Sequence, residues 1–190
     1  MATSRKLAPR SLAYTVPGMS DKDAKSVIAL LQDRLNALND LALTLKHIHW
    51  NVVGPNFIAV HTMLDPQVDA VRLMVDETAE RIATLGGSPS GTPGAMVAQR
   101  TWDDYDLGRA DAIDHMGALD VVYTGVIQAH RKGIQDTEEP DPVTQDMLIG
   151  QSTQLEMFHW FVRAHLENAS GSLTTGSART EKAAARRAHR

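Results

Sequence analysis

Two pairs of side chains that commonly bind metal ions lie within residues 61–80. His61 and Asp65 are four positions apart, and so are Asp76 and Glu80. Residues at i and i+4 of an α-helix lie one above the other, so each pair can direct its side chains at one ion. Imidazole nitrogen and carboxylate oxygen suit Fe(II), Mn(II) or Zn(II) better than a soft metal ion. Each pair is therefore a candidate half-site for a divalent metal.

The two pairs cannot bind the same ion within one straight helix. Their midpoints are about 15 residues apart, or roughly 22 Å along a helix that rises 1.5 Å per residue. If two copies of the helix cross antiparallel about a twofold axis, the His61/Asp65 pair of one chain meets the Asp76/Glu80 pair of the other. This geometry predicts two equivalent sites per dimer. A polar stripe is also typical of a solvated helix face, so the stripe alone leaves both interpretations open.

Four long segments have the apolar spacing of amphipathic helices, and no segment shows the sustained alternation of a strand. We expect helices over residues 20–51, 56–85, 107–136 and 141–170. Ser20 predicts the start of the first helix, and Asp141 followed by Pro142 predicts the start of the last. Pro66 is expected to kink the second helix near residues 62–66 because a proline removes one helical hydrogen bond. The sequence thus predicts an all-α, four-helix bundle.

The connection between the second and third helices is unusually long. A loop of about 20 residues is uncommon in a compact domain. A loop of this length can cross the whole bundle, which allows the second and third helices to point the same way. Residues 95–100 (AMVAQR) are expected to form a short extra helix within it. Long helices joined by one long crossover are the ferritin-like connectivity.

Composition limits the class of protein. At 190 residues, 43% of them hydrophobic, the chain is long enough for one globular domain and too short for two large ones. It has no cysteine, which excludes disulfides and thiolate metal sites. No apolar run approaches the roughly 20 residues that span a bilayer, and the N-terminus has no continuous apolar core of a secretory signal. We therefore expect a cytoplasmic protein without membrane contact.

Charge is divided unevenly along the chain. The net charge is −4, yet residues 171–190 carry five basic side chains and one acidic one, and the first ten residues carry three basic ones. We therefore expect a flexible basic tail over residues 1–19, the bundle over residues 20–170, and a second flexible basic tail over residues 171–190. Basic tails favour contacts with nucleic-acid phosphates. The candidate DNA-binding residues are Arg179, Lys182, Arg186, Arg187 and Arg190.

One stretch resembles a known family. The sequence KHIHWNVVGPNFIAVHTMLDPQVDAVRLMVDETAERIATLGG is similar to the signature of the Dps family, in which HW is followed by an NF-x-x-x-H-x-x-x-D segment and then by D-x-x-x-E. The resemblance implies that His49, His61 and Asp65 of one subunit form a metal site with Asp76 and Glu80 of its twofold mate. It extends in order and spacing over about residues 20–170.

The resemblance also implies an assembly and an activity. Members of this family form a hollow shell of twelve subunits that oxidises Fe(II), preferably with hydrogen peroxide, and stores the ferric product. Many also bind DNA without sequence preference, which would associate the protein with the nucleoid. Trp50, next to His49, is a candidate for taking up stray oxidising equivalents or for packing alone. The alternative function is a nucleoid-compacting shell without significant ferroxidase activity, in which the metal residues serve only assembly.

A rival metal motif occurs in the last helix. Glu156 and His159 form an E-x-x-H element of the kind that builds di-iron sites inside bundles. Such a site needs a second E-x-x-H, which this chain lacks, so we interpret both residues as surface or interface residues. Asp111 and His115 are another i,i+4 pair, but nothing nearby supports a site.

Overall fold

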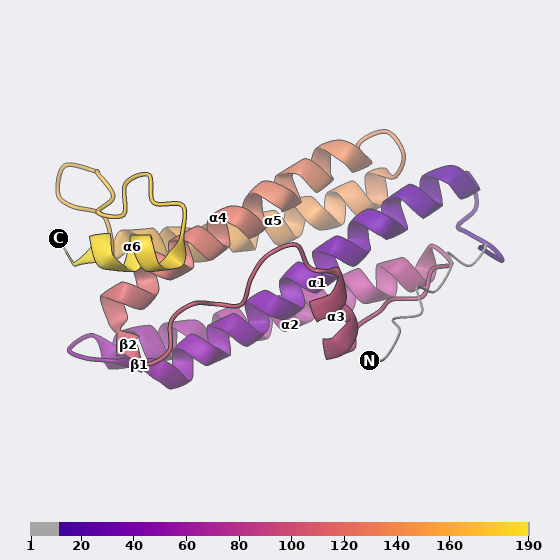
Figure 1. The fold of residues 1–190 in the computed structure, drawn as a ribbon. Coiled ribbons are helices and arrows are strands. Elements are labelled where there is room, and N and C mark those ends of the chain that lie inside the picture. The colour runs from indigo at the N-terminus through magenta and orange to yellow at the C-terminus, as the bar shows by residue number, and fades with distance from the viewer. Residues whose placement is uncertain (1–11, 190) are drawn as a thin grey trace.

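The computed structural model describes residues 12–189. The helices are α1 (Asp21–Asn51), α2 (Phe57–Thr84), α3 (Pro93–Gln99), α4 (Ala112–Thr137), α5 (Pro142–Ala164) and α6 (Glu181–Ala188), and the short strands are β1 (Val52–Val53) and β2 (Ala110–Asp111). No helix in the described part of the chain is both long enough and apolar enough to span a bilayer. Four long helices form the bundle, and the remaining elements lie at its side and at one end (Figure 1).

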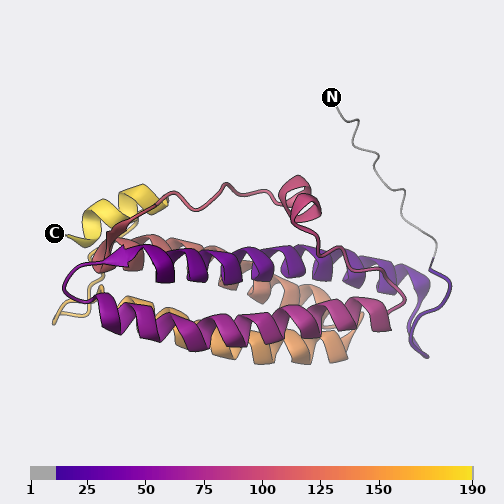
Figure 2. The same ribbon diagram turned by 90° about the horizontal axis from the view of Figure 1, so that it is seen from below.

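The bundle consists of two helical hairpins. Helix α2 folds back along α1, and α5 folds back along α4 (Figure 2). The apolar stripes of all four helices meet between the hairpins, where Leu38, Leu64, Leu119 and Leu155 are fully buried. Helices α2 and α4 both start at the end of the bundle where β1 and β2 lie, so they run in the same direction (Figure 1). The all-α, ferritin-like fold expected from the sequence is therefore confirmed.

The helix boundaries follow the signals in the sequence. Ser20 precedes α1, and its hydroxyl oxygen accepts a hydrogen bond from the backbone N–H of Asp23 at 3.1 Å. Pro142 occupies the first turn of α5, where the missing N–H of proline costs nothing. Helix α2 continues through Pro66 as a single element. Helix α5 ends at Ala164, earlier than the expected residue 170.

The long crossover is held against α1 by polar side chains. Gln32 bonds both the N–H and the carbonyl of Ser90, and Asp40 accepts hydrogen bonds from Arg100 and Trp102. Helix α3 lies within this crossover and confirms the expected short helix, although it starts two residues earlier. The crossover ends at β2, which pairs in parallel with β1 and joins the end of α1 to the start of α4. The sequence did not predict these two strands because each is only two residues long.

The C-terminal segment differs from the flexible tail expected over residues 171–190. Within it, α6 packs against the first half of α4, with Ala184 and Ala185 buried. Gly117 makes this close approach possible, since a Cβ atom there would lie 2.8 Å from the carbonyl oxygen of Ala184. Thr180 caps the helix by accepting a hydrogen bond from the N–H of Ala183 at 3.3 Å. Small side chains therefore give this basic segment a docking face.

A buried carboxylate fixes the loop that leads to α6. Asp120 accepts hydrogen bonds from His159 at 2.7 Å, from Arg163 at 2.8 Å and from Thr175 at 3.2 Å. Burial alone would raise the pKa of Asp120, but the hydrogen bonds from His159 and Arg163 outweigh it and lower the pKa. His159 is buried, so its assignment as a surface or interface residue is wrong. Its partner is Asp120, whereas Glu156 pairs with Arg131.

A second buried ion pair joins the two hairpins at the other end of the bundle. Arg81 of α2 donates two hydrogen bonds to Asp141, at 2.9 and 2.8 Å, and a third to Thr144 at 3.0 Å. Burial alone would raise the pKa of Asp141, but hydrogen bonds from Thr144 and Arg81 hold it below its usual value. The pair therefore stabilises the fold above the unfolded-state pKa of Asp141 and stops doing so as the pH falls through the lower folded-state pKa.

Removing the carboxylate of Asp141 is expected to destabilise the subunit strongly. The variant Asp141→Ala leaves the guanidinium of Arg81, whose side chain is only 15% exposed, without its partner, and breaking such a largely buried pair costs about 3–5 kcal/mol. Denaturant unfolding followed by circular dichroism measures the loss. The matched control is Asp136→Ala, which breaks an exposed pair with Lys132 and should cost less than about 1 kcal/mol. Equal unfolding midpoints for the two variants would contradict this assignment.

Candidate metal centre

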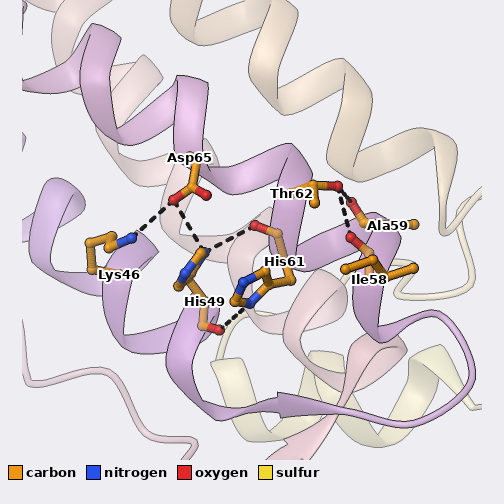
Figure 3. Close-up of polar contacts among 7 residues, drawn as sticks. All are labelled: Lys46, His49, Ile58, Ala59, His61, Thr62 and Asp65. Atoms are coloured by element: carbon orange, nitrogen blue, oxygen red, sulfur yellow. Dashed lines mark hydrogen bonds and ion pairs between the residues drawn. The ribbon is translucent and has the colours of Figure 1, made fainter.

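Two histidines from different helices form the centre of the site. His49 Nδ1 lies 3.0 Å from the carbonyl oxygen of His61, and His61 Nδ1 lies 2.9 Å from the carbonyl oxygen of His49 (Figure 3). The two rings stack with their centroids 3.6 Å apart. A backbone carbonyl only accepts hydrogen bonds, so each Nδ1 must carry the proton. A neutral ring that donates from Nδ1 keeps its lone pair on Nε2, the state in which histidine binds metals.

The end of α1 explains one of these two hydrogen bonds, the one from His61 to the carbonyl of His49. The last carbonyls of a helix have no partner within the helix, and they must find one elsewhere. The chain leaves α1 into β1 and a turn at Gly54, so the carbonyl of His49 is available to His61. The turn needs glycine because its φ is +92°. The short α1–α2 connection thus places the start of α2 beside the end of α1.

A carboxylate completes the cluster within the subunit. Asp65 Oδ1 lies 3.3 Å from His49 Nδ1 and 2.9 Å from the ammonium of Lys46 (Figure 3). The hydrogen bond from Lys46 lowers the pKa of Asp65, and the charge of Lys46 and those of His49 and His61 when protonated act in the same direction. Asp65 is therefore ionised at neutral pH. Sequence reasoning missed Lys46, although its position one turn before His49 places both on the same face of α1.

The structure does not bring Asp76 and Glu80 to this cluster. Both are exposed on α2, 11 and 15 positions beyond Asp65, which corresponds to roughly 16 and 22 Å along the helix axis. His49, His61 and Asp65 therefore form one cluster in each subunit, and two exposed carboxylates lie further along α2. The distance between the two groups along α2 is the one from which the sequence analysis predicted a site shared between two chains.

The surroundings of the two half-sites are unusually apolar for an exposed face. Trp50 is 71% exposed, Ile58 63% and Leu73 72%. Trp50 also has the ammonium of Lys46 at 5.9 Å from its ring centroid. Large exposed apolar side chains beside polar ones are typical of subunit interfaces. These side chains favour a covered face over a solvated one.

Comparison with known proteins agrees with the fold. Residues 28–171 match the ferritin-like domain. The chain is 58% identical over 178 residues to the DNA protection during starvation protein of Mycolicibacterium smegmatis, covering 94% of this chain and 97% of that one. The chain belongs to the Dps family. Among solved structures, Streptomyces coelicolor DpsA14 has a TM-score of 0.87 at 62% identity, covering 88% of this chain and 100% of that one. Mycobacterium smegmatis Dps has a TM-score of 0.87 at 59% identity, covering 89% and 97%.

Four of the five basic residues expected to bind DNA lie on or beside α6 of this Dps protein. Arg179 and Arg186 are exposed. Lys182 pairs with Asp106 at 2.8 Å, and Arg187 donates to the carbonyl of Thr175 at 3.2 Å. Arg190 lies outside the described residues. The C-terminal charges are thus presented by a helix docked on the bundle.

Proposed function

We propose that this protein is a Dps-type mini-ferritin that oxidises Fe(II) with hydrogen peroxide at sites shared between subunits. His49, His61 and Asp65 of one subunit would bind the ion together with Asp76 and Glu80 of the twofold mate. The observation that carries the proposal is the reciprocal pair of hydrogen bonds between His49 and His61. These bonds place the proton of each ring on Nδ1, so the Nε2 lone pair of each is available to a ligand, and the ionised Asp65 lies beside His49.

The donor set suits Fe(II) as the substrate. Two imidazoles and three carboxylates offer nitrogen and oxygen ligands, which disfavours a soft ion. In the overall reaction two Fe(II) ions each lose one electron, and the O–O bond of one peroxide accepts both electrons with two protons to form two waters. The ferric product would be stored in a hollow shell of twelve subunits. Removal of Fe(II) and peroxide together would protect DNA from hydroxyl radicals.

Trp50 has two possible roles in this proposal. Its place beside His49 suits a residue that takes up stray oxidising equivalents before they leave the site. Its 71% exposure suits packing against the twofold mate equally well. A Trp50→Phe variant keeps most of the packing area and removes the more easily oxidised ring, so it separates the two roles.

A peroxide titration of the Fe(II)-loaded assembly tests the proposed activity. Stepwise addition of hydrogen peroxide is expected to reach its absorbance end point at two Fe(II) oxidised per peroxide. Mass measurement before and after the titration should show an intact shell that retains the iron. An end point at one or more peroxides per Fe(II), or release of the iron, would contradict the proposed chemistry.

We further propose that the shell binds DNA without sequence preference through the basic residues on and around α6, in the cytoplasm and at the nucleoid. Exposed Arg179 and Arg186 are the best-placed candidates, because Lys182 and Arg187 already contact protein groups. Twelve copies of a weakly basic surface would act together, since multivalent contacts reinforce one another. The acidic body of the subunit would oppose this attraction.

Neutralising the two exposed arginines is expected to weaken DNA binding. The variant Arg179→Gln/Arg186→Gln removes two positive charges per subunit, so retention in a gel shift should disappear at a lower salt concentration. The matched control is Lys22→Gln/Lys25→Gln, which removes two exposed charges at the start of α1. Equal salt dependence of the two variants would rule out α6 as the DNA-binding element.

A further inference from the structure

A second group of metal-ligating side chains lies far along the chain from the first. Asp111 precedes α4, Asp114 is in its first turn, and His189 follows the last residue of α6. One ligand atom from each residue lies within 4.8 Å of the other two. His189 Nε2 is 2.7 Å from Asp114 Oδ1. The docking of α6 at the start of α4 brings these residues together (Figure 1).

Asp111 stands at the N-cap position of α4, but its side chain does not cap the helix. An aspartate at the N-cap usually accepts a hydrogen bond from a backbone N–H in the first turn of the helix. Every residue in the first turn of α4 is described in the structure. None of the backbone N–H groups of this turn donates a hydrogen bond to the carboxylate of Asp111. Its Oδ1 is instead directed at the α1–α2 turn, where a Cβ atom on Gly54 would lie 2.9 Å away. The carboxylate is therefore available to a ligand.

The electrostatics of the group favour a cation. Two carboxylates contribute two negative charges, and the C-terminal end of α6 adds unpaired backbone carbonyls and the negative end of the helix dipole. The positive end of the α4 dipole and the guanidinium of Arg187 weaken this attraction for a cation. Arg187, however, donates to the carbonyl of Thr175 at 3.2 Å, which fixes its guanidinium on the loop. One imidazole with two carboxylates is a ligand set typical of Zn(II) and Mn(II).

We propose that Asp111, Asp114 and His189 form a divalent-cation site that fastens α6 to the bundle. The ion would join the end of α6 to the start of α4, beside the α1–α2 turn. This site is separate from the His49/His61 half-site, and its function is to hold the basic C-terminal helix in its docked position. Without the ion, α6 keeps its buried alanines and the exposed pair between Lys182 and Asp106.

Hydrogen exchange of α6 in the assembled protein tests the site. Zn(II) binds the docked helix and not the undocked one, so it should slow amide exchange over residues 181–189. The expected slowing is about tenfold when free Zn(II) stands at ten times its Kd. If Zn(II) leaves the exchange of α6 unchanged, His189 and Asp114 form an ion pair only and the proposal fails.

Two variants identify the residues responsible, and two further variants serve as controls. His189→Gln and Asp111→Asn should each abolish the effect of Zn(II) on α6. The matched control Asp106→Asn breaks the ion pair between Lys182 of α6 and Asp106 of the crossover, so the basal exchange of α6 rises but the slowing by Zn(II) persists. Slowing that survives in His189→Gln and Asp111→Asn would overturn the proposal. Asp76→Asn/Glu80→Gln should retain the slowing, so a failure of the iron site and a failure of this site are distinguishable.

Discussion

Replacing Asp76 with asparagine and Glu80 with glutamine is expected to reduce peroxide-dependent Fe(II) oxidation at least about 100-fold. Loss of an outer partner of a metal ligand already costs 10- to 100-fold, and these substitutions remove two carboxylate ligands outright. Both side chains are exposed on α2 in the isolated subunit, so the bundle should fold unchanged. Stopped-flow absorbance of ferric formation measures the rate, and mass measurement confirms that the shell is intact.

The matched control for this variant is Asp69→Asn. Asp69 lies on α2 between the two half-sites and is also exposed, so its loss changes the charge of the same face without removing a proposed ligand. Its oxidation rate should stay within about twofold of the parent protein because a distant surface charge is largely screened. Undiminished oxidation by an intact Asp76→Asn/Glu80→Gln shell would show that these carboxylates are not ligands of the reacting iron and would contradict the proposed site. A parent shell that oxidises Fe(II) no faster than buffer alone would instead favour the nucleoid-compacting shell without ferroxidase activity.

The fold was predictable because its signals are local. The Ser20 cap, the proline after Asp141 and the apolar stripes each act within one or two turns of helix, and the structure confirms the elements that they predict. The pairing of His61 with Asp65 was predictable for the same reason, because the two residues are one turn apart on α2. His49 joins them through the short α1–α2 connection, which the sequence marks with glycine and proline.

The parts that were not predicted depend on contacts between distant residues. His159 was interpreted as a surface or interface residue, whereas it is buried and hydrogen-bonded to Asp120, which lies 39 positions away in the sequence. The basic charge of residues 171–190 suggested a flexible tail, and the sequence analysis overlooked a helix face of small alanine side chains that packs on the bundle. Thr180 followed by Glu181, Lys182 and three alanines is a helix start, and it could have revealed α6.

Mixing two inactive variants is expected to restore oxidation. One variant, His61→Ala/Asp65→Ala, lacks the first half-site, and the other, Asp76→Ala/Glu80→Ala, lacks the second. In a dimer of the two, one site combines both defects and the other combines both intact halves. Random pairing makes half of the dimers mixed, so about a quarter of all sites recover if each site is shared about a twofold axis.

The recovered fraction separates the two possible geometries of the site. If His61 and Glu80 acted on one ion within the same chain, every chain in the mixture would carry a defect and no activity would return. The distance along α2 already argues against that geometry, because the two pairs are roughly 22 Å apart on one continuous helix. Unfolding and refolding the two variants together, with each refolded alone as control, measures the fraction. Recovery of about a quarter of the activity would mean that oxidation depends on the contact between subunits. A folded subunit without its mate should then oxidise Fe(II) no faster than either variant alone.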